Sequence, residues 1–299
     1  MAAPMVLDDE MEAAIAAAAM GVQLVLPGDQ IQTETDFLRG HGTVKEGEDL
    51  VATVGGVVER VNKLITVRPL KARYSADVGD VVVGRITELT NKRWKVDVNG
   101  KQDAILMLSA INLPGGTLRR RTQADVLNMR NFFVEGDLIS AEVQQVHGDG
   151  SMALHTRNLK YGKLQCGSFL AAPPALVKRC KSHFRKLDCG VTMILGKNGY
   201  IFLSVSTLED EQARLASTEE HQAPTASPFA VSAEDRLKIA RVRNCINALV
   251  DQFVAIFPKT VNETYNASLD HAPKDLLVPT VMEEITASAK LCVPRGNEV

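Results

Sequence analysis

Residues 78–157 are a succession of short apolar runs separated by sequences that favour turns. In the run Trp94–Val98, apolar and polar residues alternate, as in a strand with one buried face. Asn99–Gly100 follows directly, and Asn-Gly between two such runs is a strong hairpin signal. The pattern predicts strands at residues 80–89, 94–98, 101–108, 137–146 and 151–157. Five strands with a long connection before the fourth fit a small closed barrel of the OB (oligonucleotide/oligosaccharide-binding) type.

The segment before this unit is also rich in β-type sequence. Residues 50–70 predict two strands joined near Asn62–Lys63, with Gly55–Gly56 permitting a sharp bend. A Gly-Asp pair occurs three times directly before a β-branched run, at Gly28–Asp29, Gly79–Asp80 and Gly136–Asp137. We expect each pair to form a turn that leads into a strand.

Beyond Arg157 the pattern becomes a mixture of α and β. We expect a helix over residues 172–187, entered through Pro173–Pro174, and strands over residues 190–195 and 200–205. A longer amphipathic helix is predicted over residues 232–258, where Ser232 and Asp235 form a capping signal. Its predicted apolar face comprises Ile239, Val242, Ile246, Leu249, Phe253 and Phe257. A last helix is expected from about Pro279 to Leu291.

The net charge of −2 conceals a segregation of charge along the chain. Residues 1–36 carry seven acids and no Lys or Arg, and residues 207–235 carry seven acids and one Arg. Residues 119–188 carry 12 Lys or Arg and 6 Asp or Glu. A basic middle between acidic segments is typical of polyanion binding by one part of a protein, and a chance distribution of solvated charge is the alternative.

The sequence contains none of the common catalytic signatures G-x-S-x-G, H-E-x-x-H or G-x-x-x-x-G-K-[ST]. None of the cysteines, which are Cys166, Cys180, Cys189, Cys245 and Cys292, forms a C-x-x-C pair. We therefore expect no catalytic residues, no metal site, no cofactor and reduced thiols inside the cell. No run approaches the ~20 apolar residues of a membrane span. An enzyme whose site leaves no local signature is one alternative.

Three basic stretches are candidates for RNA contact. Arg119, Arg120 and Arg121 are consecutive in the long connection of the barrel and suit a phosphate backbone, with a solvated basic loop or a contact to an acidic neighbouring subunit as the alternatives. The second stretch offers RNA contacts or packing at a domain junction through His155, Arg157, Lys160 and Lys163. The third surrounds the predicted helix at residues 172–187, with a solvated face as the alternative, and contains Lys178, Arg179 and Lys181.

Two further features look like nucleic-acid elements and favour structural interpretations. Gly196-Lys197-Asn198-Gly199 has the G-x-x-G spacing of the loop with which K-homology (KH) modules clamp a nucleic-acid backbone. That loop joins two helices, whereas here strand-like runs lie on both sides of a tight-turn Asn-Gly, so we expect a hairpin tip. Trp94 alternates in phase with Val96 and Val98, which predicts a core residue instead of a ring that stacks on bases.

The stretches LVLPGD, GHGT, WKVDVNG, AINLPGG, LRRR, GDLISAEVQ, LHTR, LKYGKL, LVKR and ILGKNG lie between about Leu24 and Val205. Together they resemble the ribosomal RNA-processing protein four family, the S-one/KH cap subunits of the eukaryotic RNA exosome. The resemblance implies a non-catalytic subunit that sits with other caps on a ring of phosphorolytic-nuclease-like subunits. It further implies that RNA is guided into the channel for processing and decay of rRNA, mRNA and other RNAs, in nucleus, nucleolus and cytoplasm. A free-standing RNA-binding regulator built from the same modules is the alternative.

These inferences divide the chain into four parts. They are an acidic, flexible leader at residues 1–23, a β-rich N-terminal domain at residues 24–76, an OB-fold domain of the S-one type at residues 77–157 and a KH-like domain at residues 158–299. The last part includes an acidic insertion at about residues 207–230 and the C-terminal helices. The expected fold class is multidomain, mainly β with an α+β C-terminal part.

Overall fold

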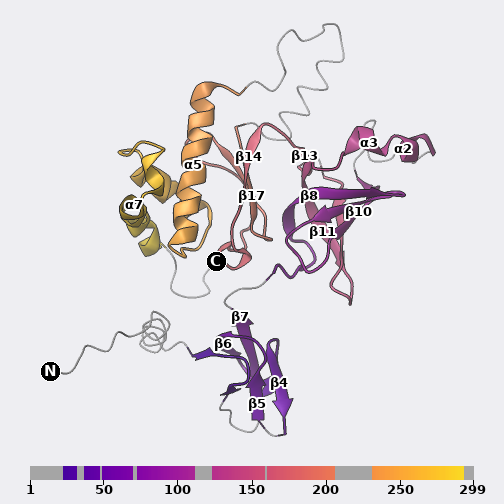
Figure 1. Ribbon diagram of the computed structural model, residues 1–299, viewed down its shortest axis with the longest axis vertical. Helices are drawn as coiled ribbons and strands as arrows, with labels where there is room; N and C mark the ends of the chain where they lie inside the picture. Colours follow the sequence, from indigo (N-terminus) through magenta and orange to yellow (C-terminus); the bar gives the residue numbers. More distant parts are fainter. Residues whose placement is uncertain are drawn as a thin grey trace, which may run out of the picture. The chain divides into compact units, whose positions relative to one another are not determined.

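The computed structural model describes residues 23–31, 37–47, 49–69, 73–111, 123–158, 160–205 and 231–292 (Figure 1). The chain divides into two compact units, residues 1–72 and residues 73–299. Residues 1–22 of the predicted leader and the predicted insertion at about residues 207–230 lie outside the described residues. Within the described ranges, no helix is long and apolar enough to cross a membrane.

The first unit is β-rich, as predicted, and its described strands form two small sheets with the orders β1-β6-β7-β3 and β2-β5-β4. The strands are β1 (Leu24–Val25), β2 (Gln30–Ile31), β3 (Leu38–Arg39), β4 (Thr43–Glu46), β5 (Asp49–Ala52), β6 (Gly56–Val61) and β7 (Leu64–Pro69). The predicted hairpin at Asn62–Lys63 is confirmed, since it joins β6 to β7 and Asn62 has φ 54°. Ile31 and Ile65, from the two sheets, share one apolar core.

The three Gly-Asp pairs form the same turn, each directly before a strand. Their glycines have φ of 95°, 88° and 94°, a region in which side chains are strained. In each turn the Asp carboxylate accepts the backbone N–H three residues earlier, at 2.7 Å (Leu26 to Asp29), 3.2 Å (Asp77 to Asp80) and 2.9 Å (Val134 to Asp137). The pair therefore supplies both the backbone geometry and the hydrogen bond that closes the turn.

The predicted five-stranded barrel is present in the second unit. It consists of β8 (Val81–Thr90), β9 (Arg93–Asp97), β10 (Ala104–Ile111), β11 (Leu138–Val146) and β12 (Met152–Thr156). The order β12-β10-β9-β8-β11 is closed by pairing of β11 with β12, which removes the open edges. The connection from β10 to β11 contains α2 (Gln123–Leu127) and α3 (Met129–Phe132), and β13 (Gly162–Leu164) pairs with the outside edge of β11.

The Asn99–Gly100 turn joins β9 to β10, but the loop is longer than the two residues predicted. Asn99 has the expected positive φ of 59°, and β10 begins only at Ala104. The cause lies in two competing contacts. The Asp97 carboxylate accepts the Asn99 amide at 2.9 Å, and the Asn99 carbonyl accepts the amide of Tyr74 at 3.1 Å, so this backbone does not continue the β9–β10 ladder.

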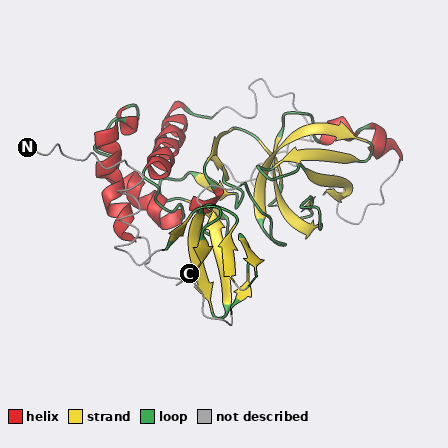
Figure 2. Ribbon diagram, turned by 60° about the horizontal axis from the view of Figure 1, so that its bottom comes forward, coloured by secondary structure: helices red, strands yellow, loops and turns green. Residues whose placement is uncertain are grey.

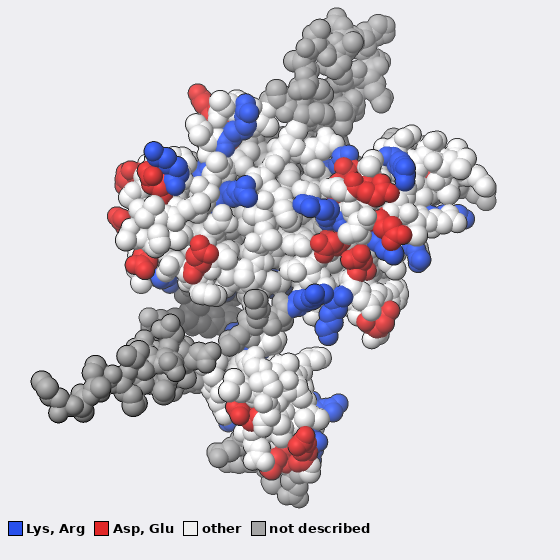
Figure 3. Space-filling model, viewed as in Figure 1, with Lys and Arg blue, Asp and Glu red and all other residues white. Residues whose placement is uncertain are grey.

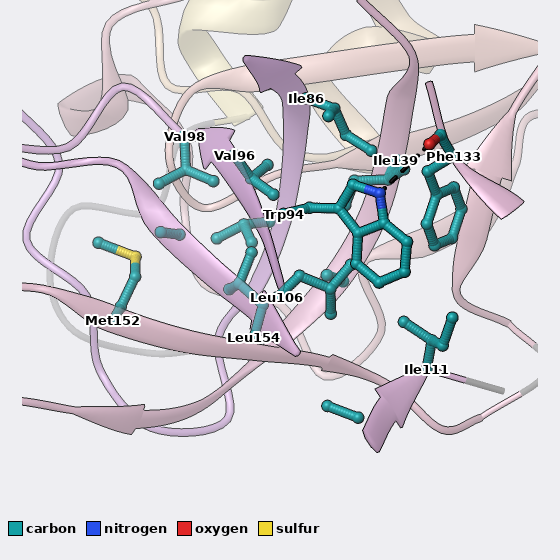
Figure 4. Close-up of a cluster of buried hydrophobic side chains, with 14 of the residues drawn as sticks. Ile86, Trp94, Val96, Val98, Leu106, Ile111, Phe133, Ile139, Met152 and Leu154 are labelled. Carbon is teal, nitrogen blue, oxygen red and sulfur yellow. Dashed lines mark hydrogen bonds between the residues drawn. The ribbon is translucent and has the colours of Figure 1, made fainter. Parts of the chain in front are cut away.

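Trp94 lies in the barrel core, as predicted (Figure 4). It is fully buried, and its indole N–H donates to the carbonyl of Phe133 at 3.2 Å. The ring of Phe133 stands edge-on to the indole, with ring centroids 5.4 Å apart. Because the indole is enclosed and its polar atom is satisfied, it offers no surface on which a base could stack.

An antiparallel sheet of order β14-β17-β16-β15 follows the barrel. Its strands are β14 (Gly167–Ala171), β15 (Phe184–Lys186), β16 (Thr192–Leu195) and β17 (Tyr200–Ser204). Both faces are covered. One face packs on the helices through Met193 and Leu203, and the other meets the barrel strand β8, where Ile194 and Phe202 contact Val83.

The C-terminal helices gather on one side of this sheet (Figure 2). They are α5 (Ala233–Asp251), α6 (Pro258–Ala267) and α7 (Pro279–Cys292), with a short 3₁₀ turn, η2 (Asp275–Leu277), before α7. The predicted last helix is therefore confirmed, whereas α6 was not predicted. The predicted capping of α5 is also present, since the Ser232 hydroxyl accepts the Asp235 amide at 3.1 Å.

The prediction of a helix over residues 172–187 is wrong. Only a 3₁₀ turn, η1 (Pro174–Leu176), forms there, and residues 184–186 are the edge strand β15. The backbone finds partners in distant segments instead. The Leu176 carbonyl accepts the amide of Ile256 at 2.8 Å, and the Lys178 amide donates to the Ile256 carbonyl at 3.3 Å. Tertiary pairing thus replaces the hydrogen bonds that a helix would make.

The helix predicted over residues 232–258 ends earlier, at Asp251. The amides of Phe253 and Val254 donate to the carbonyls of Val250 and Leu249 at 3.0 and 2.8 Å, the two bonds of a Schellman motif. Phe253 occupies the left-handed position, with φ 52°, and its side chain is 82% exposed. The predicted apolar face is therefore correct from Ile239 to Leu249 and wrong at Phe253, and Phe257 lies beyond the helix, at the N-cap of α6.

Candidate nucleic-acid interface

The predicted RNA contacts fall in different surroundings. Arg119, Arg120 and Arg121 lie outside the described residues. The other candidates lie on two stretches that border the junction between the barrel and the sheet.

The stretch from His155 to Lys163 contributes mainly to that junction. The Tyr161 hydroxyl donates to the Glu142 carboxylate at 2.8 Å, and the Tyr161 ring packs against Phe184 of the sheet. Burial, together with this hydrogen bond, raises the pKa of Tyr161. His155 is partly buried and edge-on to the same ring, and the Lys163 ammonium lies 2.8 Å from Asp137.

Arg157 and Lys160 differ from these residues because both are exposed. They are therefore the two cations of this stretch that a polyanion can reach without disturbing the junction.

Arg179 connects the two parts of the second unit. Its guanidinium lies 3.2 Å from the carboxylate of Asp80, which is 2% exposed and belongs to the turn before β8. The contact is an ion pair without the alignment of a hydrogen bond. The other Asp80 oxygen accepts the Tyr74 hydroxyl at 2.7 Å, and burial with this bond raises the pKa of Tyr74. Arg179 is thus a partner for a buried carboxylate, because an unpaired charge there would be costly.

Among the described residues, the neighbouring lysines have no such partner. The Lys178 ammonium lies 5.8 Å from the ring centroid of Phe257, a distance suited to a cation–π contact. Lys181 is exposed. Neither residue is on a helix, so the basic helical face expected here does not exist.

Gly196-Lys197-Asn198-Gly199 connects β16 to β17 as a hairpin tip, the geometry that the sequence predicts. Gly199 has φ 87°, and a Cβ atom there would lie 2.1 Å from the carbonyl oxygen of Ala172. Both the backbone angle and the lack of space require glycine.

The hairpin tip is inserted against the barrel. Asn198 is fully buried, and its amide nitrogen donates to the carbonyls of Val83 at 2.7 Å and Val98 at 3.0 Å. The backbone N–H of Lys197 donates to the Val81 carbonyl at 2.9 Å. A KH loop would offer its backbone N–H groups to phosphate. Here the loop amide of Lys197 and the side chain of Asn198 instead donate hydrogen bonds to the barrel. Sequence reasoning identified the turn and missed this contact, which joins residues about a hundred positions apart.

A groove on the barrel is the better candidate for RNA. It has a volume of about 860 Å³ and lies between the β8–β9 turn, β10 and α2. Lys92 and Arg93 are exposed on its wall, beside the polar side chains of Asn91 and Gln123. Neither cation is among the RNA contacts predicted from the sequence. No aromatic side chain is among the described residues that line it, which favours contact with phosphates over base stacking.

Charge on the described surface is mixed. On the face shown in Figure 3, Lys and Arg side chains are interspersed with Asp and Glu side chains. Within the basic middle of the chain at residues 119–188, Arg130, Lys163 and Arg179 each lie next to a carboxylate. The segregation seen along the sequence is therefore reduced by pairing in the described structure.

The described residues contain no group of three or more His, Cys, Asp or Glu side chains placed to hold a metal ion. Cys245 is buried, and burial raises the pKa of its thiol to about 11, so this thiol is protonated at neutral pH.

Three family models match the chain. They are "RRP4, S1 domain" at residues 73–145, "Exosome complex exonuclease RRP4 N-terminal region" at residues 24–61 and "KH domain" at residues 167–208. The S1 match covers most of the barrel, and the KH match covers the sheet with its hairpin tip.

Similar proteins are known from animals and fungi. "Exosome complex component RRP4" of Mus musculus is 52% identical over 88% of this chain and 87% of its own length. "Exosome complex component rrp4" of Schizosaccharomyces pombe is 44% identical over 89% of this chain and 82% of its own length. The Saccharomyces cerevisiae protein with this description is 40% identical over 88% of this chain and 81% of its own length.

Proposed function

Because this chain belongs to the RRP4 family of exosome complex components, we propose that it is a non-catalytic, RNA-binding cap subunit of an RNA exosome. The observation that carries the proposal is identity of 52% across nearly the whole of a named exosome component. The order of an N-terminal β unit, an OB-type barrel and a KH-type sheet agrees with it.

In this proposal the cap sits with other caps on a ring of phosphorolytic-nuclease-like subunits, stabilises the ring and guides RNA towards its channel. The barrel and the KH-type sheet suit this role because Asn198 and Arg179 fasten them to each other. A fixed arrangement of two modules can present one surface to the ring and another to RNA.

Guidance of RNA would rely on electrostatic contacts at the barrel groove. Lys92 and Arg93 line it, and so does Gln123, which directly follows the segment containing Arg119, Arg120 and Arg121. Cations without aromatic platforms bind the backbone and discriminate little between sequences. Such binding suits a subunit that must accept rRNA, mRNA and other RNAs for processing and decay, in nucleus, nucleolus and cytoplasm.

The direct test is purification of the native complex through a tag on this chain, followed by mass spectrometry of the intact assembly. A cap subunit brings ring proteins and other caps at a fixed stoichiometry. A chain recovered alone, or with RNA only, would instead support a free-standing RNA-binding regulator built from the same modules.

The non-catalytic part of the proposal has its own test. The purified chain should leave RNA intact with or without phosphate, because hydrolysis and phosphorolysis both belong to other subunits in this proposal. Nuclease activity that follows the chain through successive columns, and is lost when one of its own carboxylates is replaced, would refute it.

A further inference from the structure

Strand β14 forms an edge of the KH-type sheet, and among the described residues the backbone groups on its outer side have no partners. The Ala172 amide donates to the Gly199 carbonyl, so by alternation Leu170 and Ser168 also bond to β17. The N–H and C=O groups of Gly167, Phe169 and Ala171 consequently point away from the sheet. No hydrogen bond to these groups occurs within the part of the chain that the structure describes. An open edge of this kind can pair with another extended chain.

A groove of about 510 Å³ lies beside the first residues of this strand, with α5 as its second wall; we call it the β14 edge groove. Figure 1 shows α5 lying alongside β14. Gly167 and Ser168 form the strand wall, and Ile239 and Leu277 supply apolar surface between the walls. The groove therefore combines unpaired backbone groups with an apolar strip, as a site for an added strand does.

Two exposed arginines, Arg236 and Arg243, line the α5 wall of the groove. They are seven residues apart, which is two helical turns or about 10 Å. Neither has an ion-pair partner among the described residues. Side chains at alternate positions of a strand are about 7 Å apart, so two or three acids on one face of an added strand can reach both guanidiniums.

We propose that the β14 edge groove binds an extended acidic segment of a partner protein, which adds a strand to β14 and places alternate carboxylates against Arg236 and Arg243. Backbone pairing supplies general affinity, and the arginines select for acids. The site lies in the KH-type sheet and is separate from the barrel groove assigned to RNA. A peptide fits better than RNA because the wall opposite α5 is the beginning of the open strand β14, and no aromatic side chain is among the described residues that line the groove.

The test uses the full-length chain and a fluorescent peptide of about ten residues in which Glu and Thr alternate, with binding followed by anisotropy at low salt. We expect saturable binding, weakened at least about tenfold by the double replacement Arg236→Glu and Arg243→Glu. Lys259→Glu on α6 is the matched control, because this exposed lysine lies outside the groove, and it should leave the affinity unchanged.

Strand addition is tested separately from charge. The same peptide methylated at alternate backbone nitrogens keeps its acids and loses its strand hydrogen bonds, so it should also bind at least about tenfold more weakly. Ala171→Pro removes one outward N–H and spares the bonds to β17, and it should weaken binding several-fold at an unchanged melting temperature.

Four results would overturn the proposal. They are no binding of the peptide, equal binding of its methylated form, tighter binding of an oligouridylate that depends on the same arginines, and equal binding of a Lys-Thr peptide. A fifth is acidic-peptide binding that occurs only after deletion of residues 209–228, because the groove would then belong to the chain's own acidic segment.

Discussion

Replacing Asn198 with alanine would remove the side chain that fastens the hairpin tip to the barrel. Two well-formed hydrogen bonds would be lost, at 2.7 and 3.0 Å, together with a longer one of 3.4 Å from the Val83 amide to the Asn198 oxygen. Each good bond contributes about 0.5–1.5 kcal/mol, and buried carbonyls left without a donor cost about 1–3 kcal/mol. We expect the free energy of unfolding to fall by about 2–4 kcal/mol.

Urea unfolding can be followed by tryptophan fluorescence, because the chain has a single tryptophan, Trp94, which is buried in the barrel. Asn266→Ala is the matched control, since Asn266 is exposed on α6 and should change the free energy by about 0.5 kcal/mol or less. RNA binding by the assembled complex should be unaffected by Asn198→Ala at temperatures where the protein is folded. A loss below about 1 kcal/mol with an unchanged denaturant slope would mean that the tip does not hold the barrel to the sheet.

Three other outcomes follow from the same geometry. Gly199→Val should lower the free energy of unfolding by more than about 1 kcal/mol, because the added Cβ would meet the Ala172 carbonyl and φ is positive; a neutral thermal melt would contradict this. Lys197→Asp should leave RNA affinity in filter binding almost unchanged. It should lower the melting temperature slightly, because the Lys197 ammonium donates to the Val177 carbonyl. A variant that melts normally but loses most of its RNA affinity would show that the loop is a phosphate clamp. Replacing Arg119, Arg120 and Arg121 by Ser in the reconstituted complex should reduce the salt slope of RNA binding by up to about two, and an unchanged slope would exclude them from the RNA path.

The barrel was predictable because its signals are local. Alternation around Trp94, positive-φ residues at turns and Gly-Asp pairs before strands each operate within a few residues. The same kind of reasoning failed over residues 172–187, where a helix was expected and an edge strand forms. Leu176 and Lys178 pair there with Ile256, and no local pattern reveals a partner nearly eighty positions away.

The candidate site shows the same limit. Consecutive arginines and isolated cations can be read from the sequence, but the pairing of the RNA candidate Arg179 with Asp80 cannot. Lys92 and Arg93 were not selected, because the groove that gives them meaning is assembled from β8, β9, β10 and α2. The strand β16 was predicted within residues 190–195 and is present, but all four of its residues are buried, so its sequence does not show which layer covers each face.

Burial of β16 and β17 on both faces has a thermodynamic consequence. The barrel cannot open at β8 without exposing Ile194 and Phe202, and the helices cannot detach without exposing Met193 and Leu203. Separating the barrel, the sheet or the helices from the rest therefore always costs free energy, because each separation exposes buried apolar side chains. The second unit should behave as one cooperative block, in which a lesion in any layer shortens the lifetime of the whole, and proteolytic quality control would remove such variants as complete chains.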